Sequence, residues 1–258
     1  MALLQVRDCT LRFEGLTAVS GFSLSVEPGE LVGMIGPNGA GKTTVFNMIA
    51  GVYRPQVGSI LFGGVSIVGL RPHQIASLGI ARTFQNVRLF GALSVLDNVR
   101  IAAHHTARYG LLDAALRNAR FRRQESLIRR QALSLLRLLG LSGAKNQPAH
   151  SLPYGLQRRL EIARALAARP RLLLLDEPTA GMTPVETQSL MHLIKSLRDD
   201  LHVTIVLIEH DMRVVMGICE RVIVLDHAVQ IAEGTPAVIR NDPAVIEAYL
   251  GEVTDEQQ

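Results

Sequence analysis

Nearly uninterrupted apolar runs recur along the chain between segments of mixed polarity, and this pattern predicts an α/β fold. Three such runs occur, at Leu31–Ile35, Leu172–Leu175 and Val203–Ile208. The first indicates a buried strand, and the other two are typical of strands buried on both faces of a parallel sheet. Residues 4–35 also alternate apolar and polar stretches with turn signals, which indicates antiparallel strands leading up to residue 36. Shorter elements are predicted around them: hairpin strands at Gly58–Phe62 with Val65–Ile67 and at Val222–Leu225 with Val229–Ala232, helices at Arg71–Leu78 and Ala244–Leu250, and a strand at Ile80–Phe84.

Residues 86–165 lack strand-like runs. Apolar residues there recur instead at the spacing of an amphipathic helix, at Ile128, Ala132, Leu135, Leu136 and Leu139. We therefore predict a single domain over residues 1–258, in which residues 86–165 form an inserted helical subdomain. Residues 252–258 are predicted to be a polar tail.

The helical segment also carries a cluster of arginines, namely Arg117, Arg120, Arg122, Arg123, Arg129 and Arg130. Such a cluster is most often a solvated helix face. The alternative is a contact for lipid headgroups or for a partner protein, and the sequence alone leaves both open.

The composition and net charge of the chain exclude several classes of function. Hydrophobic residues make up 48% of the chain and charged residues 19%, which is a globular balance. The net charge of +4 is too small and too dispersed to indicate a nucleic-acid partner. Cys9 and Cys219 are the only cysteines, so there is no disulfide framework. Without a signal-peptide profile or an apolar run of about 18 residues, we expect a soluble cytoplasmic protein that reaches a membrane by docking on another protein.

A glycine-rich stretch between a predicted strand and a predicted helix carries the clearest chemistry. Its residues, Gly36-Pro37-Asn38-Gly39-Ala40-Gly41-Lys42-Thr43, fit the phosphate-binding pattern G-x-x-x-x-G-K-[ST]. Glycines let backbone N–H groups surround a phosphate, and the helix predicted at Thr44–Ala50 points its positive end at the anion. Lys42 is expected to reach the β- and γ-phosphates and the Thr43 hydroxyl to hold Mg²⁺, with Thr44 also at the nucleotide. The sequence therefore predicts binding of a nucleoside triphosphate.

Polar residues follow the predicted strands. Asp176 and Glu177 end the Leu172–Leu175 run, Gln85 follows Phe84, and His210 comes soon after Ile208. Open α/β sheets bind ligands at the carboxyl ends of their strands, so these side chains are candidates for the same site. Phe13 is either a core aromatic or a ring that stacks on a nucleotide base, and periodicity alone favours the core.

The order and spacing of these motifs resemble the ATP-binding subunit of ABC transporters over nearly the whole chain. A finer resemblance, to the ATPase subunit of branched-chain amino-acid importers, rests on four segments: residues 82–90, 158–164, 208–212 and 248–251. The resemblance implies a P-loop cassette with an N-terminal antiparallel β region and an inserted helical subdomain.

The resemblance also implies roles for individual residues. Phe13 would stack on adenine, which reverses the preference from periodicity. Asp176 would help to hold Mg²⁺, Glu177 would be the general base for the attacking water, and His210 would contact the γ-phosphate. Gln85 would join the metal and the water to the surface that contacts a membrane partner.

One segment departs from the family pattern. The family signature Leu-Ser-Gly-Gly-Gln corresponds here to Leu152-Pro153-Tyr154-Gly155-Leu156, and in the family it contacts ATP on the opposite subunit. Pro153, Tyr154 and Gly155 are thus implied ligands of a partner's nucleotide, although Pro153 has neither a hydroxyl nor an N–H. In a heteromeric pair this segment would give the slower site. A further departure is Thr183, which stands where an aspartate is common.

The resemblance implies an ATPase that powers a branched-chain amino-acid importer from the cytoplasmic face of the membrane. Its partners would be permease subunits, docked through their coupling helices, a second ATP-binding subunit and, indirectly, a substrate-binding protein. The alternatives are the ATPase of an exporter and an ATP-dependent binding module without transport. A metabolic P-loop kinase fits less well, because it leaves His210 and the signature-like segment unexplained.

Overall fold

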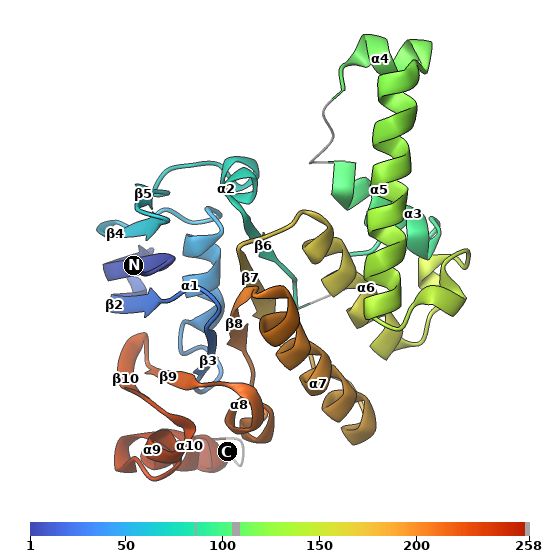
Figure 1. The fold of residues 1–258 in the computed structure, drawn as a ribbon. Helices are drawn as coiled ribbons and strands as arrows, with labels where there is room; N and C mark the ends of the chain where they lie inside the picture. The colour runs from blue at the N-terminus through green and yellow to red at the C-terminus, as the bar shows by residue number, and fades with distance from the viewer. Residues whose placement is uncertain (86, 105–108, 256–258) are drawn as a thin grey trace.

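The strands form two sheets in the computed structural model, which describes residues 1–85, 87–104 and 109–255 (Figure 1). The smaller sheet is antiparallel and has the order β2-β1-β4-β5. Its strands are β1 (Leu4–Phe13), β2 (Leu16–Val26), β4 (Val57–Phe62) and β5 (Val65–Ser66). This sheet is the predicted N-terminal antiparallel region together with the first predicted hairpin.

The larger sheet has the order β10-β9-β3-β8-β7-β6. Its strands are β3 (Leu31–Ile35), β6 (Ile80–Arg82), β7 (Leu172–Asp176), β8 (Thr204–Ile208), β9 (Arg221–Asp226) and β10 (Val229–Gly234). All neighbours pair in parallel except β9 and β10, which form the second predicted hairpin. The expectation that residues 4–35 form antiparallel strands is therefore wrong for β3, which joins the parallel sheet.

The strand β6 is shorter than predicted and ends at Arg82, although the Thr83 N–H still donates to the Leu174 carbonyl oxygen of β7. The Thr83 hydroxyl accepts a hydrogen bond from the Asp176 backbone N–H, and the Phe84 N–H donates to the Glu161 carboxylate. These contacts take the chain out of the β ladder and toward the helical segment.

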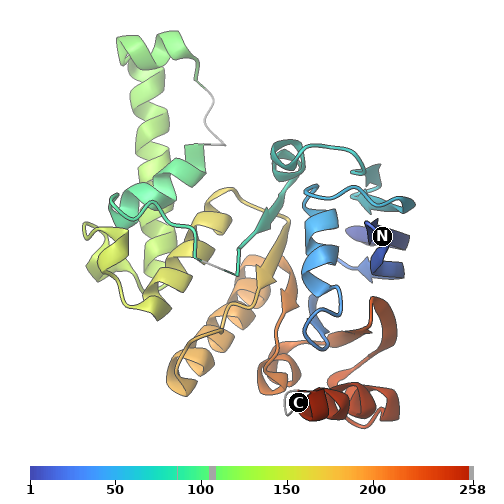
Figure 2. The same ribbon diagram turned by 180° about the vertical axis from the view of Figure 1, so that it is seen from behind.

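Helices cover both faces of the larger sheet and form a separate lobe beside it (Figures 1 and 2). Those packed around the sheets are α1 (Lys42–Ile49), α2 (Pro72–Leu78), α7 (Pro184–Leu201), α8 (Met212–Ile218), α9 (Pro236–Arg240) and α10 (Pro243–Asp255). The lobe contains α3 (Val95–Ala103), α4 (Leu111–Leu116), α5 (Ala119–Leu138), α6 (Tyr154–Ala167) and short 3-10 turns at Ser142–Ala144 and Ala149–Ser151. Among the helices of the described ranges, none is long and apolar enough to cross a bilayer.

Two boundaries differ from the sequence-based ones. The helix α6 continues to Ala167, beyond the predicted limit of the helical subdomain at residue 165. The helix α10 continues to Asp255, so residues 252–255 of the predicted polar tail have a helical backbone, and residues 256–258 lie outside the described part.

Alternate residues of the buried strands enter two different hydrophobic cores. Leu173 and Leu175 of β7 pack in the core that contains the apolar side chains of α5 to α8. Leu172 and Leu174 pack in the core that contains α1 and the antiparallel sheet. Side chains of a strand alternate between its faces, so a sheet covered on both sides needs apolar residues at every position. This explains the four consecutive leucines, and it leaves only the strand ends for polar chemistry.

Candidate nucleotide and hydrolysis site

The carboxyl ends of the parallel strands meet at one edge of the larger sheet. The glycine-rich loop follows β3, Gln85 follows β6, Glu177 follows β7 and His210 follows β8. This is the edge at which the sequence places the candidate residues, because parallel strands all point their carboxyl ends the same way.

The loop from Gly36 to Gly41 wraps into α1 in a conformation that its glycines permit. Gly36, Gly39 and Gly41 have φ values of 146°, 77° and 101°. A Cβ atom on Gly36 would lie 1.9 Å from the Leu225 carbonyl oxygen. The Lys42 side chain is buried, and its Nζ donates hydrogen bonds to the carbonyl oxygens of Gly36 at 2.6 Å and Pro37 at 2.7 Å. The ammonium group is thereby held inside the loop, next to the backbone N–H groups at the start of α1.

An open pocket of about 630 Å³ lies over this loop. Its lining includes most of the predicted site residues, namely Phe13, Asn38, Gly39, Ala40, Gly41, Lys42, Thr43, Thr44, Gln85, Glu177 and His210, together with Leu16, Thr17, Ala18, His227 and Ala228. Of the other candidates, Pro37 borders a neighbouring pocket, and Gly36 and Asp176 are buried behind the lining. Residues from six separate segments are thus gathered around one space.

Phe13 lies at the rim of this pocket and is 40% exposed, so the core role favoured by periodicity is wrong. Its ring packs edge to face against Tyr53, with the ring centroids 5.1 Å apart. The Phe13 ring is therefore partly exposed where it borders the pocket.

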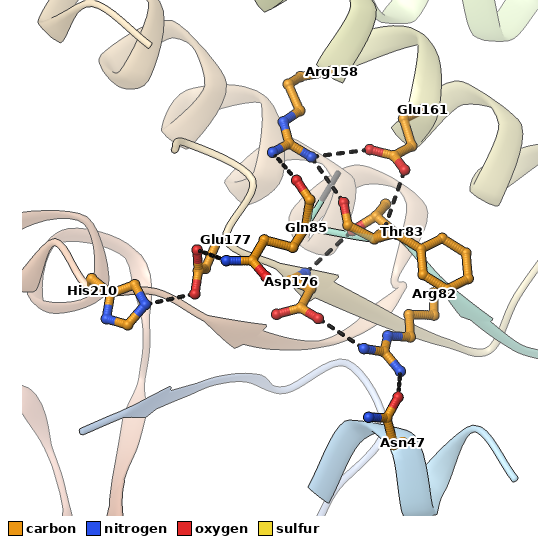
Figure 3. A network of polar contacts seen from close by, with 10 residues as sticks. Asn47, Arg82, Thr83, Gln85, Arg158, Glu161, Asp176, Glu177 and His210 are labelled. Carbon is orange, nitrogen blue, oxygen red and sulfur yellow. Dashed lines mark hydrogen bonds and ion pairs between the residues drawn. The ribbon is translucent and has the colours of Figure 1, made fainter. Parts of the chain in front are cut away.

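The Glu177 carboxylate is held from two sides (Figure 3). Gln85 Nε2 donates to one carboxylate oxygen at 3.0 Å, and His210 Nε2 donates to the other at 2.5 Å. Glu177 has a positive φ of 46°, in the left-handed region that non-glycine residues rarely adopt. Strain of this kind is concentrated at functional sites, where the surrounding contacts fix it. Its carboxylate is thus held in one direction at the mouth of the pocket.

The Asp176 carboxylate forms an ion pair with Arg82. Its Oδ2 lies 2.8 Å from Arg82 Nη2, and Arg82 also donates to Asn47 Oδ1 of α1 at 2.6 Å (Figure 3). Burial raises the pKa of Asp176, and the hydrogen bond and charge of Arg82 oppose that rise. The other carboxylate oxygen, Oδ1, is buried and has no hydrogen-bond partner in the described part of the chain. A buried acceptor without a donor fits the hydration shell of a divalent cation, with the Thr43 hydroxyl as a further oxygen ligand.

The helix α6 fixes the position of Gln85. Arg158 donates hydrogen bonds to the carbonyl oxygens of Phe84 and Gln85, and it also pairs with Glu161, which accepts from the Phe84 N–H (Figure 3). Arg158 and Glu161 are both buried, and burial raises the pKa of the Glu161 carboxyl. Neither residue was predicted to have a role of its own. Their opposite charges three residues apart on a helix were the only signal.

The signature-like segment lies outside this pocket. Pro153 is the N-cap of α6, and Tyr154 is exposed and packs its ring under the Arg158 guanidinium. Gly155 is buried, and a Cβ there would lie 2.6 Å from Glu186 Oε1. Thr183 is the N-cap of α7 and forms a capping box with Glu186. Threonine and aspartate both cap helices well, which accounts for Thr183 where aspartate is common.

The fold and this pocket define a P-loop nucleotide-binding cassette. The family model described as "ABC transporter" matches residues 19–180, and the one described as "Branched-chain amino acid ATP-binding cassette transporter" matches residues 229–255. The chain therefore belongs to the ABC transporter ATP-binding family, in which ATP hydrolysis is coupled to transport.

Individual relatives agree with this assignment. The "High-affinity branched-chain amino acid transport ATP-binding protein LivG" of Escherichia coli (strain K12) is 48% identical over 250 residues, which are 97% of this chain and 98% of that protein. The solved ADP conformation of MJ1267, an ATP-binding cassette of an ABC transporter, has a TM-score of 0.84 and 28% identity, covering 97% of this chain and 99% of that one. The dimeric post-hydrolysis structure of the cassette MJ0796, bound to ADP and Pi, has a TM-score of 0.77 and 26% identity, covering 90% and 98%.

Replacing Arg82 by Met should lower the free energy of unfolding by about 3–5 kcal/mol, because the Asp176 carboxylate stays buried without its cation. The pKa of Asp176 is already raised in the folded chain, so its ionisation opposes folding. The loss should therefore be small near the unfolded-state pKa of about 3.9 and grow as the pH rises through the higher folded-state pKa. Urea unfolding across this range measures it.

The double variant Arg82→Met with Asp176→Asn is the matched control, because it removes both charges of the pair. It should recover most of the lost stability and lose the extra pH dependence. A single variant as stable as the unchanged protein at every pH would contradict this account of the pair.

Proposed function

We propose that the chain hydrolyses ATP with Mg²⁺ and energises an importer of branched-chain amino acids. The observation that carries the chemistry is the Glu177 carboxylate, held by Gln85 and His210 at the mouth of the pocket above the glycine-rich loop. The names of relatives such as LivG, at 48% identity over nearly the full chain, support the transported class.

The residues divide the work of phosphoryl transfer. The loop N–H groups and Lys42 neutralise the phosphates, and Phe13 offers its partly exposed ring to the adenine. Thr43 and Asp176 would hold Mg²⁺, which when bound neutralises charge on the β- and γ-phosphates. Glu177 accepts a proton from the attacking water, and His210 keeps the carboxylate turned toward it and faces the γ-phosphate. The catalytic power of such a site comes from positioning and charge neutralisation.

A second cassette would complete the site. The start of α6, at Pro153, Tyr154 and Gly155, lies away from the pocket of its own chain, and helix N-termini bind anions through their unpaired N–H groups. The dimeric form of the cassette MJ0796, bound to ADP and Pi, supports assembly with a second cassette.

A groove beside Gln85 is the proposed seat of a permease coupling helix. Its volume is about 620 Å³, and it is lined by Arg82, Phe84, Arg88, Leu89, Phe90, Ala102, Glu161, Arg164 and Ala165. Phe84 and Phe90 are 38% and 46% exposed, so the groove offers two aromatic anchors. Arg158 binds the backbone of both Phe84 and Gln85, so a partner that contacts Phe84 in the groove would act on Gln85 through these contacts. The chain would then sit peripherally on the cytoplasmic face of a membrane, and a substrate-binding protein would act on it only through the permease.

Replacing Glu177 by Gln should reduce ATP turnover by about 10²–10⁴-fold, because the amide cannot accept the proton of the attacking water. Binding of ATP should remain, since the phosphate loop is unchanged. Steady-state turnover and fluorescent-nucleotide binding measure the two effects, and Glu27→Gln is the matched control on the exposed surface. Undiminished turnover in Glu177→Gln would reject Glu177 as the base.

Restoring the family residues in the signature-like segment tests whether this segment acts on the nucleotide of a second cassette. Ser at position 153 would add a hydroxyl donor to a γ-phosphate oxygen, and a hydrogen bond to a charged group of about 1.5 kcal/mol corresponds to about tenfold in rate. The variant Pro153→Ser with Leu156→Gln should therefore hydrolyse ATP faster in the assembled complex, at the site facing this segment. Leu156→Gln alone is the control, and an unchanged rate in the double variant would sink the proposal that this segment acts on a partner's nucleotide.

A further inference from the structure

The helix α5 carries most of its charge on the side that faces away from the protein. Its 20 residues include six arginines and a single carboxylate, Glu125. Its buried residues, Ile128, Ala132 and Leu136, follow one another at four-residue spacing along a different side of the helix.

Helical geometry brings five of the arginines together. At 100° per residue they fall within about 120° of one another around the helix axis. We name this set the arginine ridge: Arg122, Arg123, Arg129, Arg130 and Arg137, all exposed. From residue 122 to residue 137 it is about 22 Å long, at about 1.5 Å per residue.

The one carboxylate of α5 does not neutralise the ridge. Glu125 points toward α3, where it pairs with Arg100 at 2.9 Å and accepts a hydrogen bond from the Tyr109 hydroxyl at 2.8 Å. Burial would raise the pKa of Glu125, but these partners outweigh it and hold the pKa below its usual value. Across the described ranges, no carboxylate forms an ion pair with any residue of the ridge.

The ridge accounts for the whole excess of positive charge. The chain has a formal net charge of +4, and the ridge contributes +5, so the remaining residues sum to −1. An ordinary solvated helix face alternates acidic and basic residues, which attract each other at this spacing. A face of arginines alone repels itself, and this is a cost that an anionic surface would offset.

The ridge runs along most of α5, and Arg122 and Arg123 lie on the half of the helix that extends from the body. The first half of α5 and α4 rise beyond the rest of the lobe (Figures 1 and 2). The helix α3, which packs against α5, contributes Ala102 to the groove proposed for the coupling helix. The arm formed by α4 and α5 therefore begins at the wall of that groove.

We propose that the arginine ridge binds the phosphate groups of anionic phospholipids at the membrane surface beside the permease. This rests on the proposed function, which brings the groove to a membrane. Guanidinium groups bind phosphate oxygens in pairs, and an anionic leaflet attracts basic side chains near it. Leu116 and Leu127, exposed on the same arm, supply apolar contact at the headgroup level. Lipid is favoured over nucleic acid because the rest of the chain carries no positive excess to surround a duplex.

Co-sedimentation of the full chain with vesicles tests the proposal. Binding should be strong on phosphatidylcholine vesicles that contain phosphatidylglycerol, weak on phosphatidylcholine alone, and weakened by salt. The ridge variant replaces Arg122, Arg123, Arg129 and Arg130 by Gln. The control variant replaces the exposed Arg7, Arg54, Arg71 and Arg240 by Gln, so both variants lose four charges. The ridge variant should bind anionic vesicles at least about tenfold more weakly than the control variant.

Several outcomes would overturn the proposal. They are equal vesicle binding by the two variants, no preference of the unchanged chain for anionic vesicles, and ridge-dependent binding to a short DNA duplex in preference to vesicles. A third variant with Lys at the four ridge positions should keep most of the binding. If the Gln variant loses its helical circular dichroism, the Lys variant is used in its place. Failure of the Lys variant to bind anionic vesicles would then count against the lipid contact.

Nucleotide binding by the same samples separates the two proposals. A ridge variant that binds MgATP normally but no longer binds anionic vesicles supports the ridge as a lipid contact. If the unchanged chain binds vesicles through the ridge but neither binds nor hydrolyses MgATP, the proposed ATPase function is rejected and the proposed lipid contact is still supported.

Discussion

Two adjacent carboxylates at the end of a buried strand set the central constraint on this structure. Asp176 and Glu177 are both almost fully buried, and neighbouring negative charges in such a place require partners. Each takes its partners from other segments: Arg82 for Asp176, and Gln85 with His210 for Glu177. The ends of β6, β7 and β8 are therefore tied together by the charges that phosphoryl transfer uses. Burial raises the pKa of Asp176. An ionised carboxylate at this position therefore lowers the free energy of unfolding.

The same contacts connect the carboxylates to the rest of the cassette. From Glu177 the chain of hydrogen bonds runs through Gln85 to Arg158 on α6, the helix that begins at the signature-like segment. Glu161, one turn further along α6, binds the Phe84 backbone at the floor of the exposed groove. A movement of α6 relative to the sheet would thus displace Gln85, and with it the carboxylate that Gln85 holds. This gives the proposed coupling between permease and hydrolysis a physical route through named contacts.

Local sequence patterns predicted the parts of the site that depend on local geometry. The glycine-rich loop, the apolar strands and the polar residues at their ends all follow from spacing and side-chain type, and the structure places them around one pocket. The pairing partner of Leu31–Ile35 could not be predicted, because β3 lies between strands that come much later in the chain. Arg82 and Arg158 were missed for a similar reason: their partners are 94 and about 74 residues away, and no local pattern reports a buried contact over such distances. Periodicity alone favoured the core for Phe13, because its alternation with neighbours matches that of a buried strand residue, and only the family resemblance predicted its place at the nucleotide.

The central claim is that this chain carries one half of an ATP site and, at the start of α6, the half that closes on a partner. Static light scattering of purified Glu177→Gln protein, with and without MgATP, tests this directly, because loss of the base should trap the closed state. The account predicts a shift from the 28.1 kDa chain to a dimer of twice that mass when MgATP is added. A mass that stays at one chain while ATP is bound would contradict closure of the α6 end on a second copy of this chain, and would point to a required second cassette.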